Sequence, residues 1–126
     1  MNLIDSSAWL EYLADGPRAE TFEEAISRTQ DLLVPVICIY EVFKRVIQQR
    51  NEESALRAIA LMQQGTVIEL DTNIALKAAK RSIEYKLPMA DAIILATAQV
   101  YKATIWTQDA DFKDIKGVKY FSKTSS

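Results

Sequence analysis

The chain contains no histidine and only one cysteine among its 126 residues. The lack of histidine excludes Ser-His-Asp and Cys-His catalysis, proton transfer by imidazole, and most zinc sites. The single cysteine, Cys38, lies among apolar residues, which indicates a small buried side chain rather than a nucleophile. A chain that relies on no disulfide is typical of a reducing compartment, so we expect the protein to be cytoplasmic.

Long apolar runs are also missing, and no segment approaches the roughly 18 uncharged residues of a membrane span. The first five residues show no signal peptide pattern. The net charge of −2 argues against broad capture of nucleic acid, so any contact with a phosphate backbone must be local. Most bases are expected on helix surfaces, where a minority could guide a phosphate strand: Lys44, Arg45, Arg50, Lys80, Arg81, Lys86 and Lys102.

Short apolar runs alternate with amphipathic stretches along the whole chain, which favours one domain over residues 1–126. We predict strands at residues 3–4, 32–34, 66–70 and 104–106, and an edge strand at 118–121. The predicted helices cover residues 8–13, 17–28, 35–50, 52–63, 72–86 and 88–101, with Ser6 and Ser7 capping the first and Asp71 and Thr72 the fifth. This alternation predicts an α/β fold, a three-layer α/β/α sandwich around a parallel sheet of four to five strands.

Asp91 is the only formally charged residue between Leu87 and Tyr101. A buried, unpaired carboxylate would either be strongly destabilising or raise its pKa until it became neutral. A divalent cation would supply the missing positive charge. The alternative is an ordinary helix-start acid, because Pro88 favours the first helical position and an aspartate nearby complements the helix dipole.

Three further acids occupy positions that bring them to the same edge of the predicted sheet. Asp5 and Asp109 follow the first and fourth strands, and ligands of open parallel sheets bind beyond the carboxyl ends of strands. Glu41 lies two turns into the helix after the second strand, so it could project toward the same crevice. Each acid also has an ordinary alternative: a turn or N-cap for Asp5 and Asp109, and an exposed ion pair with Arg45 for Glu41.

Four segments, taken together and in this order, resemble the PIN-domain family, and specifically the VapC-type toxins of toxin-antitoxin pairs. They are Ile-Asp-Ser-Ser-Ala-Trp at residues 4–9, Glu41 within residues 39–42, the uncharged segment at 87–98, and Trp-Thr-Gln-Asp-Ala-Asp-Phe at 106–112. The resemblance spans nearly the whole chain and shows no departure from the acidic pattern of the family.

The resemblance implies an endoribonuclease that depends on Mg²⁺ or Mn²⁺. Its acidic cluster would be Asp5, Glu41, Asp91 and Asp109. Asp5 and Asp91 would be the most direct metal ligands, Ser7 would orient Asp5, and Asp111 would be an accessory acid or a turn cap. Magnesium and manganese are hard ions that prefer carboxylate and water oxygens, so the residue types fit the expected chemistry.

The resemblance also implies a small VapB-type antitoxin that covers the crevice, and a homodimer that aligns two sites. Exposed apolar residues on the first helices would supply the antitoxin surface, with Trp9 and Tyr12 as candidates. By themselves, both residues fit the buried side of a helix better than a docking surface.

Two other functions fit parts of the sequence. A magnesium-binding signalling receiver domain has a similar length and fold, and Asp71 after the third strand could accept its phosphate. Such a domain, however, resembles its family through adjacent acids after the first strand, whereas Asp5 is followed by serines. The other possibility is a binding module whose acids only cap helices; such caps would gain no stability from Mn²⁺.

Overall fold

A parallel sheet of five strands forms the centre of the computed structural model, which describes residues 1–123. The strands lie in the order β3-β2-β1-β4-β5, and every neighbouring pair is parallel. Their bounds are Asn2–Ile4 (β1), Leu32–Pro35 (β2), Thr66–Ile68 (β3), Thr104–Thr107 (β4) and Val118–Tyr120 (β5). The two strands that precede Asp5 and Asp109, β1 and β4, are therefore direct neighbours.

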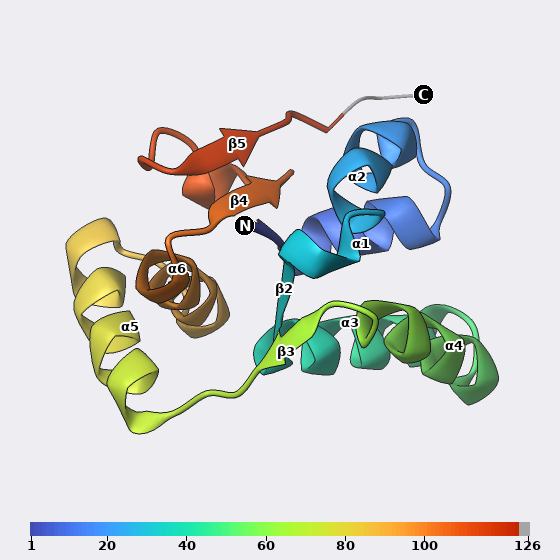
Figure 1. Cartoon of the computed structure of the whole chain (residues 1–126), viewed down its shortest axis with the longest axis horizontal. Helices are drawn as coiled ribbons and strands as arrows, with labels where there is room; N and C mark the ends of the chain where they lie inside the picture. Colours follow the sequence, from blue (N-terminus) through green and yellow to red (C-terminus); the bar gives the residue numbers. More distant parts are fainter. Residues whose placement is uncertain (124–126) are drawn as a thin grey trace.

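Helices form the crossovers that a parallel sheet requires. They are α1 (Ser6–Leu13), α2 (Ala19–Ile26), α3 (Val36–Gln49), α4 (Glu52–Met62), α5 (Thr72–Tyr85) and α6 (Met89–Tyr101), with 3₁₀ turns η1 (Thr29–Asp31) and η2 (Ala110–Phe112). Figure 1 shows the α5–α6 pair on one side of the sheet and α1, α2 and α4 toward the other, while α3 packs on α4 and α1. The predicted α/β/α sandwich with a parallel sheet is confirmed.

The ends of some elements differ from the prediction. Asp5, and not Ser6 or Ser7, caps α1, because its side chain accepts a hydrogen bond from the backbone N–H of Ala8. The second helix begins at Ala19 instead of residue 17, since the Glu11 carboxylate accepts the backbone N–H of Arg18 and holds the preceding turn. β3 ends at Ile68, two residues early. The capping of α5 by Asp71 is confirmed.

The core lies on both faces of the sheet and includes residues whose burial the sequence left open. Trp9 is fully buried and packs edge-to-face on Tyr12. Its expected place in the core is confirmed, and the alternative that Trp9 belongs to an exposed docking surface is wrong. Cys38 is buried and unpaired as expected, and burial raises the pKa of its thiol. Within residues 1–123, none of the helices has the length and apolar character needed to span a bilayer.

Candidate metal centre

Asp5 has a fixed carboxylate at the carboxyl end of β1. One oxygen, Oδ1, accepts hydrogen bonds from the Ala8 backbone N–H at 2.9 Å and from the Ser7 hydroxyl at 2.7 Å. The other, Oδ2, accepts from the hydroxyl of Thr107 at 2.5 Å. Asp5 is only 2% exposed. It is therefore both the helix cap proposed as the ordinary alternative and a buried acid held in one orientation.

Burial dominates the electrostatics of Asp5. Loss of solvent raises its pKa to about 6, even though the hydrogen bonds from Thr107, Ala8 and Ser7 stabilise the ionised form and act against the rise. The nearby charge of Asp109 raises the pKa further. A cation beside this carboxylate would relieve both unfavourable effects.

Glu41 is half-buried in the second turn of α3. Its Oε1 accepts a hydrogen bond from the hydroxyl of Ser6 at 2.6 Å, which ties α3 to the start of α1. Within residues 1–123 its carboxylate forms no ion pair with Arg45, so the exposed-pair alternative is not what the structure shows.

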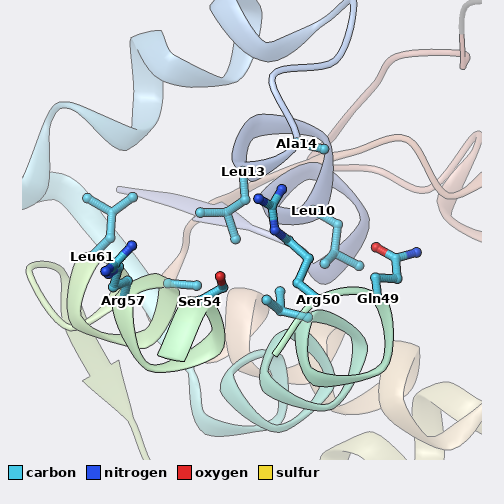
Figure 2. Close-up of a pocket in the computed structure, with 10 residues that line it drawn as sticks. Leu10, Leu13, Ala14, Gln49, Arg50, Ser54, Arg57 and Leu61 are labelled. Atoms are coloured by element: carbon cyan, nitrogen blue, oxygen red, sulfur yellow. The ribbon is translucent and has the colours of Figure 1, made fainter. Parts of the chain in front are cut away.

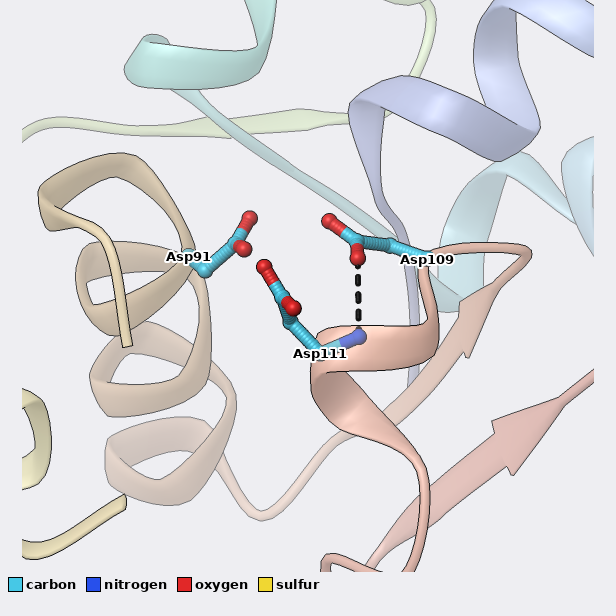
Figure 3. A group of neighbouring side chains, drawn as sticks. All are labelled: Asp91, Asp109 and Asp111. Atoms are coloured by element: carbon cyan, nitrogen blue, oxygen red, sulfur yellow. Dashed lines mark hydrogen bonds between the residues drawn. The ribbon is translucent and has the colours of Figure 1, made fainter. Parts of the chain in front are cut away.

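Asp91, Asp109 and Asp111 form the tightest acidic group. One carboxylate oxygen from each lies within 4.8 Å of the other two. Figure 3 shows Asp91 on α6 pointing across to Asp109 and Asp111, which come from the turn after β4. Asp109 caps η2, because its Oδ1 accepts the backbone N–H of Asp111 at 2.9 Å. Asp111 is exposed, whereas Asp109 and Asp91 are half-buried.

The surroundings of Asp91 disfavour its charged form. Partial burial raises its pKa to about 8, and the negative charges of Asp109 and Asp111 contribute to the rise. No salt bridge offsets the charge of Asp91, because the ion pairs among the described residues all lie elsewhere on the surface. Like charges this close repel strongly unless a proton or a cation intervenes.

All four predicted acids line one cavity of about 280 Å³. The cavity opens at the carboxyl ends of β1 and β4, where α1, α3 and α6 meet. Its lining is Asp5, Ser6, Ser7, Leu10, Glu41, Arg45, Asp91, Ile94 and Asp109. Asp111 does not line the cavity, but it lies next to Asp91 and Asp109. Asp5 and Glu41 line the cavity but do not belong to the group formed by Asp91, Asp109 and Asp111.

Two hydroxyls that support the acids were not predicted, and Arg45 was predicted only as a surface base or an ion-pair partner of Glu41. Thr107 and Ser6 each donate to one of the acids, and Arg45 is the one base of the lining, among the described residues. Thr107 also accepts the backbone N–H of Asp109 at 2.8 Å, so it connects the two strand ends. One signal could have identified Thr107: its hydroxyl comes immediately after a predicted strand and two residues before Asp109.

The donor set fits a hard divalent cation. The cavity offers carboxylate oxygens from four elements and no sulfur or imidazole, which favours Mg²⁺ or Mn²⁺ over zinc or copper. Asp71, by contrast, follows the edge strand β3 and is engaged in capping α5, with β2 between it and β1. It does not line the acidic cavity, so the geometry does not support a receiver domain with Asp71 as phosphate acceptor.

The family model for the PIN domain matches residues 3–118 of this chain. The chain belongs to the PIN-domain family. None of the curated protein sequences is significantly similar to it.

Solved structures agree with this assignment. A toxin-antitoxin complex from Klebsiella pneumoniae is 26% identical, with a TM-score of 0.84, over 98% of this chain and 100% of that one. VapC20 of Mycobacterium tuberculosis, a toxin that cleaves the sarcin-ricin loop, is 16% identical with a TM-score of 0.78, over 94% and 97%. VapBC2 from Rickettsia felis, bound to promoter DNA, is 12% identical with a TM-score of 0.75, over 96% and 97%. The latter two likenesses concern the fold.

Proposed function

We propose that this chain is a metal-dependent endoribonuclease and the toxin of a VapBC-type pair, acting as a single nuclease domain in the cytoplasm. The observation that carries the proposal is the convergence of Asp5, Glu41, Asp91 and Asp109 on one cavity from four different elements. Membership of the PIN-domain family and the likeness to a toxin-antitoxin complex support the same function.

Each acid has a distinct proposed role. Asp5 and Asp91 would hold Mg²⁺ or Mn²⁺ directly, and Glu41 and Asp109 would hold it through a carboxylate oxygen or a water. Asp111 is an accessory acid at the rim. When bound, the ion supplies Lewis acidity that polarises the scissile phosphate and makes water a better nucleophile.

The hydroxyls keep the acids in position. Thr107 and Ser7 donate to opposite oxygens of Asp5, and Ser6 donates to Glu41, so neither carboxylate has to reorganise when substrate binds. Thr107 and Ser7 also favour the ionised form of Asp5 that a metal requires. Clustered negative charge repels RNA until a cation is present, so the metal-free protein is expected to bind RNA weakly.

A larger groove beside the acidic cavity suits the antitoxin. Its volume is about 600 Å³, and it lies between α1, α3 and α4 (Figure 2). Arg50 and Arg57 lie along it with Gln49 and Ser54. Apolar side chains form its floor: Leu10, Leu13, Ala14, Val46, Ala58 and Leu61. We propose that an apolar helix of the antitoxin with flanking acidic residues occupies this groove.

We propose that the homodimer forms through a different surface, the exposed face of α5 and the start of α6. Leu76 and Ile83 lie seven residues apart on α5, therefore on one helix face, and are 63% and 82% exposed. Met89, at the start of α6, is also largely exposed. Large apolar side chains gathered on one helix pair are typical of a surface that is covered in an oligomer. Ile83→Asp should shift the protein toward monomer in sedimentation, whereas an unchanged dimer would place the interface elsewhere.

Cleavage of a mixed RNA pool by antitoxin-free protein tests the nuclease directly. Cutting is expected with Mn²⁺, none with EDTA, and none by the Asp91→Asn variant. Equal cutting by the variant would reveal a contaminating nuclease. A folded protein that binds Mn²⁺ but cuts no RNA in the pool would contradict the proposed function.

A further inference from the structure

A second hollow adjoins the acidic cavity on the exposed face of α3. Its volume is about 370 Å³, and its lining is Tyr40, Glu41, Lys44, Arg45 and Gln48. Tyr40 is 59% exposed, which is unusual for a large aromatic side chain within a helix. The ammonium group of Lys44 lies 5.8 Å from the centre of the Tyr40 ring. We call this hollow the α3 groove.

The α3 groove is continuous with the acidic cavity. Glu41 and Arg45 line both. Arg45 also lines a third hollow on the other side, with Ser7, Gln108 and Lys123. Arg45 therefore stands where three hollows meet, and among residues 1–123 it forms no ion pair that would neutralise it.

The chemistry of the α3 groove differs from that of the other open surfaces. The groove between α1, α3 and α4 is lined mainly by leucine and other aliphatic residues, and the exposed face of α5 is aliphatic. Both grooves hold two cations and an amide, but the α3 groove joins them to an exposed aromatic ring and to the Glu41 carboxylate, and it has no aliphatic lining. Aromatic rings next to cations are typical of surfaces that bind single-stranded nucleic acid, where bases stack on the rings and phosphates pair with lysine and arginine.

We propose that the α3 groove binds the single-stranded segment of RNA next to the scissile phosphate. A base stacks on Tyr40, Arg45 contacts the phosphate at the mouth of the acidic cavity, and Lys44 contacts the next one. A duplex cannot use this groove, because its bases are already stacked on one another. The inference rests on the proposed nuclease and names the form of its substrate. It also explains how a chain with a net charge of −2 attracts a polyanion, through a local pair of cations.

Steady-state cleavage of a single-stranded RNA pool, with Mn²⁺ and at varied salt, tests this assignment. Tyr40→Ala should raise KM about tenfold with kcat largely retained, because stacking aids binding and not the chemical step. Arg45→Gln and Lys44→Gln should raise KM and each reduce the slope of log KM against log salt by about 0.7, the value for one phosphate contact on a single strand. Tyr40→Ala should leave that slope unchanged.

Matched controls come from the opposite parts of the molecule. Tyr101 is also exposed and ends α6 before β4 begins, far from the strand ends that carry the acids, and Lys116 is exposed before β5. Tyr101→Ala and Lys116→Gln should keep the KM and salt slope of the unmodified protein.

Three results would each overturn the assignment. The first is an unchanged KM in both Tyr40→Ala and Arg45→Gln, and the second is an equal rise of KM in the control variants. The third is a loss of the dimer in Tyr40→Ala, which would make Tyr40 an interface residue. Failure of the unmodified protein to cut RNA would contradict the proposed nuclease function. That result comes from the unmodified protein alone, so it is distinguishable from a failure of the α3 groove assignment.

Discussion

The acidic cavity and the groove between α1, α3 and α4 are adjacent and share Leu10, yet their chemistry is opposite. The cavity gathers negative charge, and the pKa values are raised to about 6 for the buried Asp5 and to about 8 for the half-buried Asp91. The groove leaves leucine side chains such as Leu13 and Leu61 open to water. Each surface is unfavourable by itself, and the proposed function gives each a different occupant: a cation in the first, an apolar helix in the second.

The two surfaces also differ from the interior of the protein. The apolar interior is well packed, with Trp9, Phe22 and Phe112 fully buried in one core. The two surfaces to which we assign functions expose groups that the rest of the chain does not satisfy. Stability given up in this way is common at functional sites.

The largest expected effect is on catalysis. Asp91→Asn should lower the cleavage rate about 100- to 1000-fold, because it removes both a ligand charge and the electrostatic stabilisation that depends on it. Asp71→Asn is the matched control, since Asp71 caps α5 outside the cavity and asparagine caps equally well. Rates of RNA cleavage measure both. A large loss in Asp71→Asn would support a role for that residue and contradict the assignment of the site.

Antitoxin binding should depend on the other surface. Leu13→Asp places a charge in the apolar groove, and we expect it to weaken the complex with the VapB-type antitoxin about 30-fold or more while RNA cleavage persists. Leu56→Asp is the control, because Leu56 is 55% exposed on α4 but does not line the groove. Titration calorimetry compares the two. Equal weakening by both variants would mean that the groove is not the binding surface.

A smaller effect is expected from the hydroxyl that supports Asp5. Thr107→Val removes a donor to Oδ2, which raises the pKa of Asp5 further, so the cleavage rate at neutral pH should fall about tenfold. Activity should recover as the pH rises, and Thr107→Ser should restore it at every pH. A pH-rate profile that keeps its shape in Thr107→Val would show that this hydrogen bond does not tune Asp5.

The smallest expected effect is the pH dependence of metal affinity. A cation binds ionised carboxylates, and protons compete for Asp5 and Asp91, whose pKa values are about 6 and about 8. The affinity for Mn²⁺ should therefore rise by a factor of a few for each pH unit between these values. Titrations at several pH values measure it, with proton release as a second readout. A flat profile would place the metal elsewhere.

Much of the fold was predictable because the local signals agree. Apolar runs indicate the strands, and the lone charge of Asp91 in an apolar helix is evident from the amino-acid sequence. Parallel topology then brings Asp5 and Asp109 to one edge. The burial of Trp9 agrees with the apolar side of its helix, whereas its alternative place on a docking surface came from the family resemblance and is wrong.

The side-chain contacts between segments far apart in the chain could not be predicted from the sequence. Nothing in the pattern indicates that Ser6 meets Glu41, or that Thr107 meets Asp5, since each pair depends on how α1 packs against its neighbours. The approach of Asp111 to Asp91 likewise depends on the η2 turn, which a stretch of short polar residues does not specify.

Whether the acids form a metal site is best decided by the free energy of unfolding of the unmodified protein and of Asp91→Asn, at pH 8, with EDTA and with Mn²⁺. A carboxyl whose pKa rises on folding destabilises the metal-free protein increasingly as the pH rises from the unfolded value of 3.8 toward about 8. Without metal, Asp91→Asn should therefore be more stable, by on the order of 1 kcal/mol. With Mn²⁺ the unmodified protein should become the more stable of the two, because only its complete acid cluster gains stability by binding. If Mn²⁺ stabilises neither protein, or if the substitution destabilises the metal-free state, the acids are structural and the account is wrong.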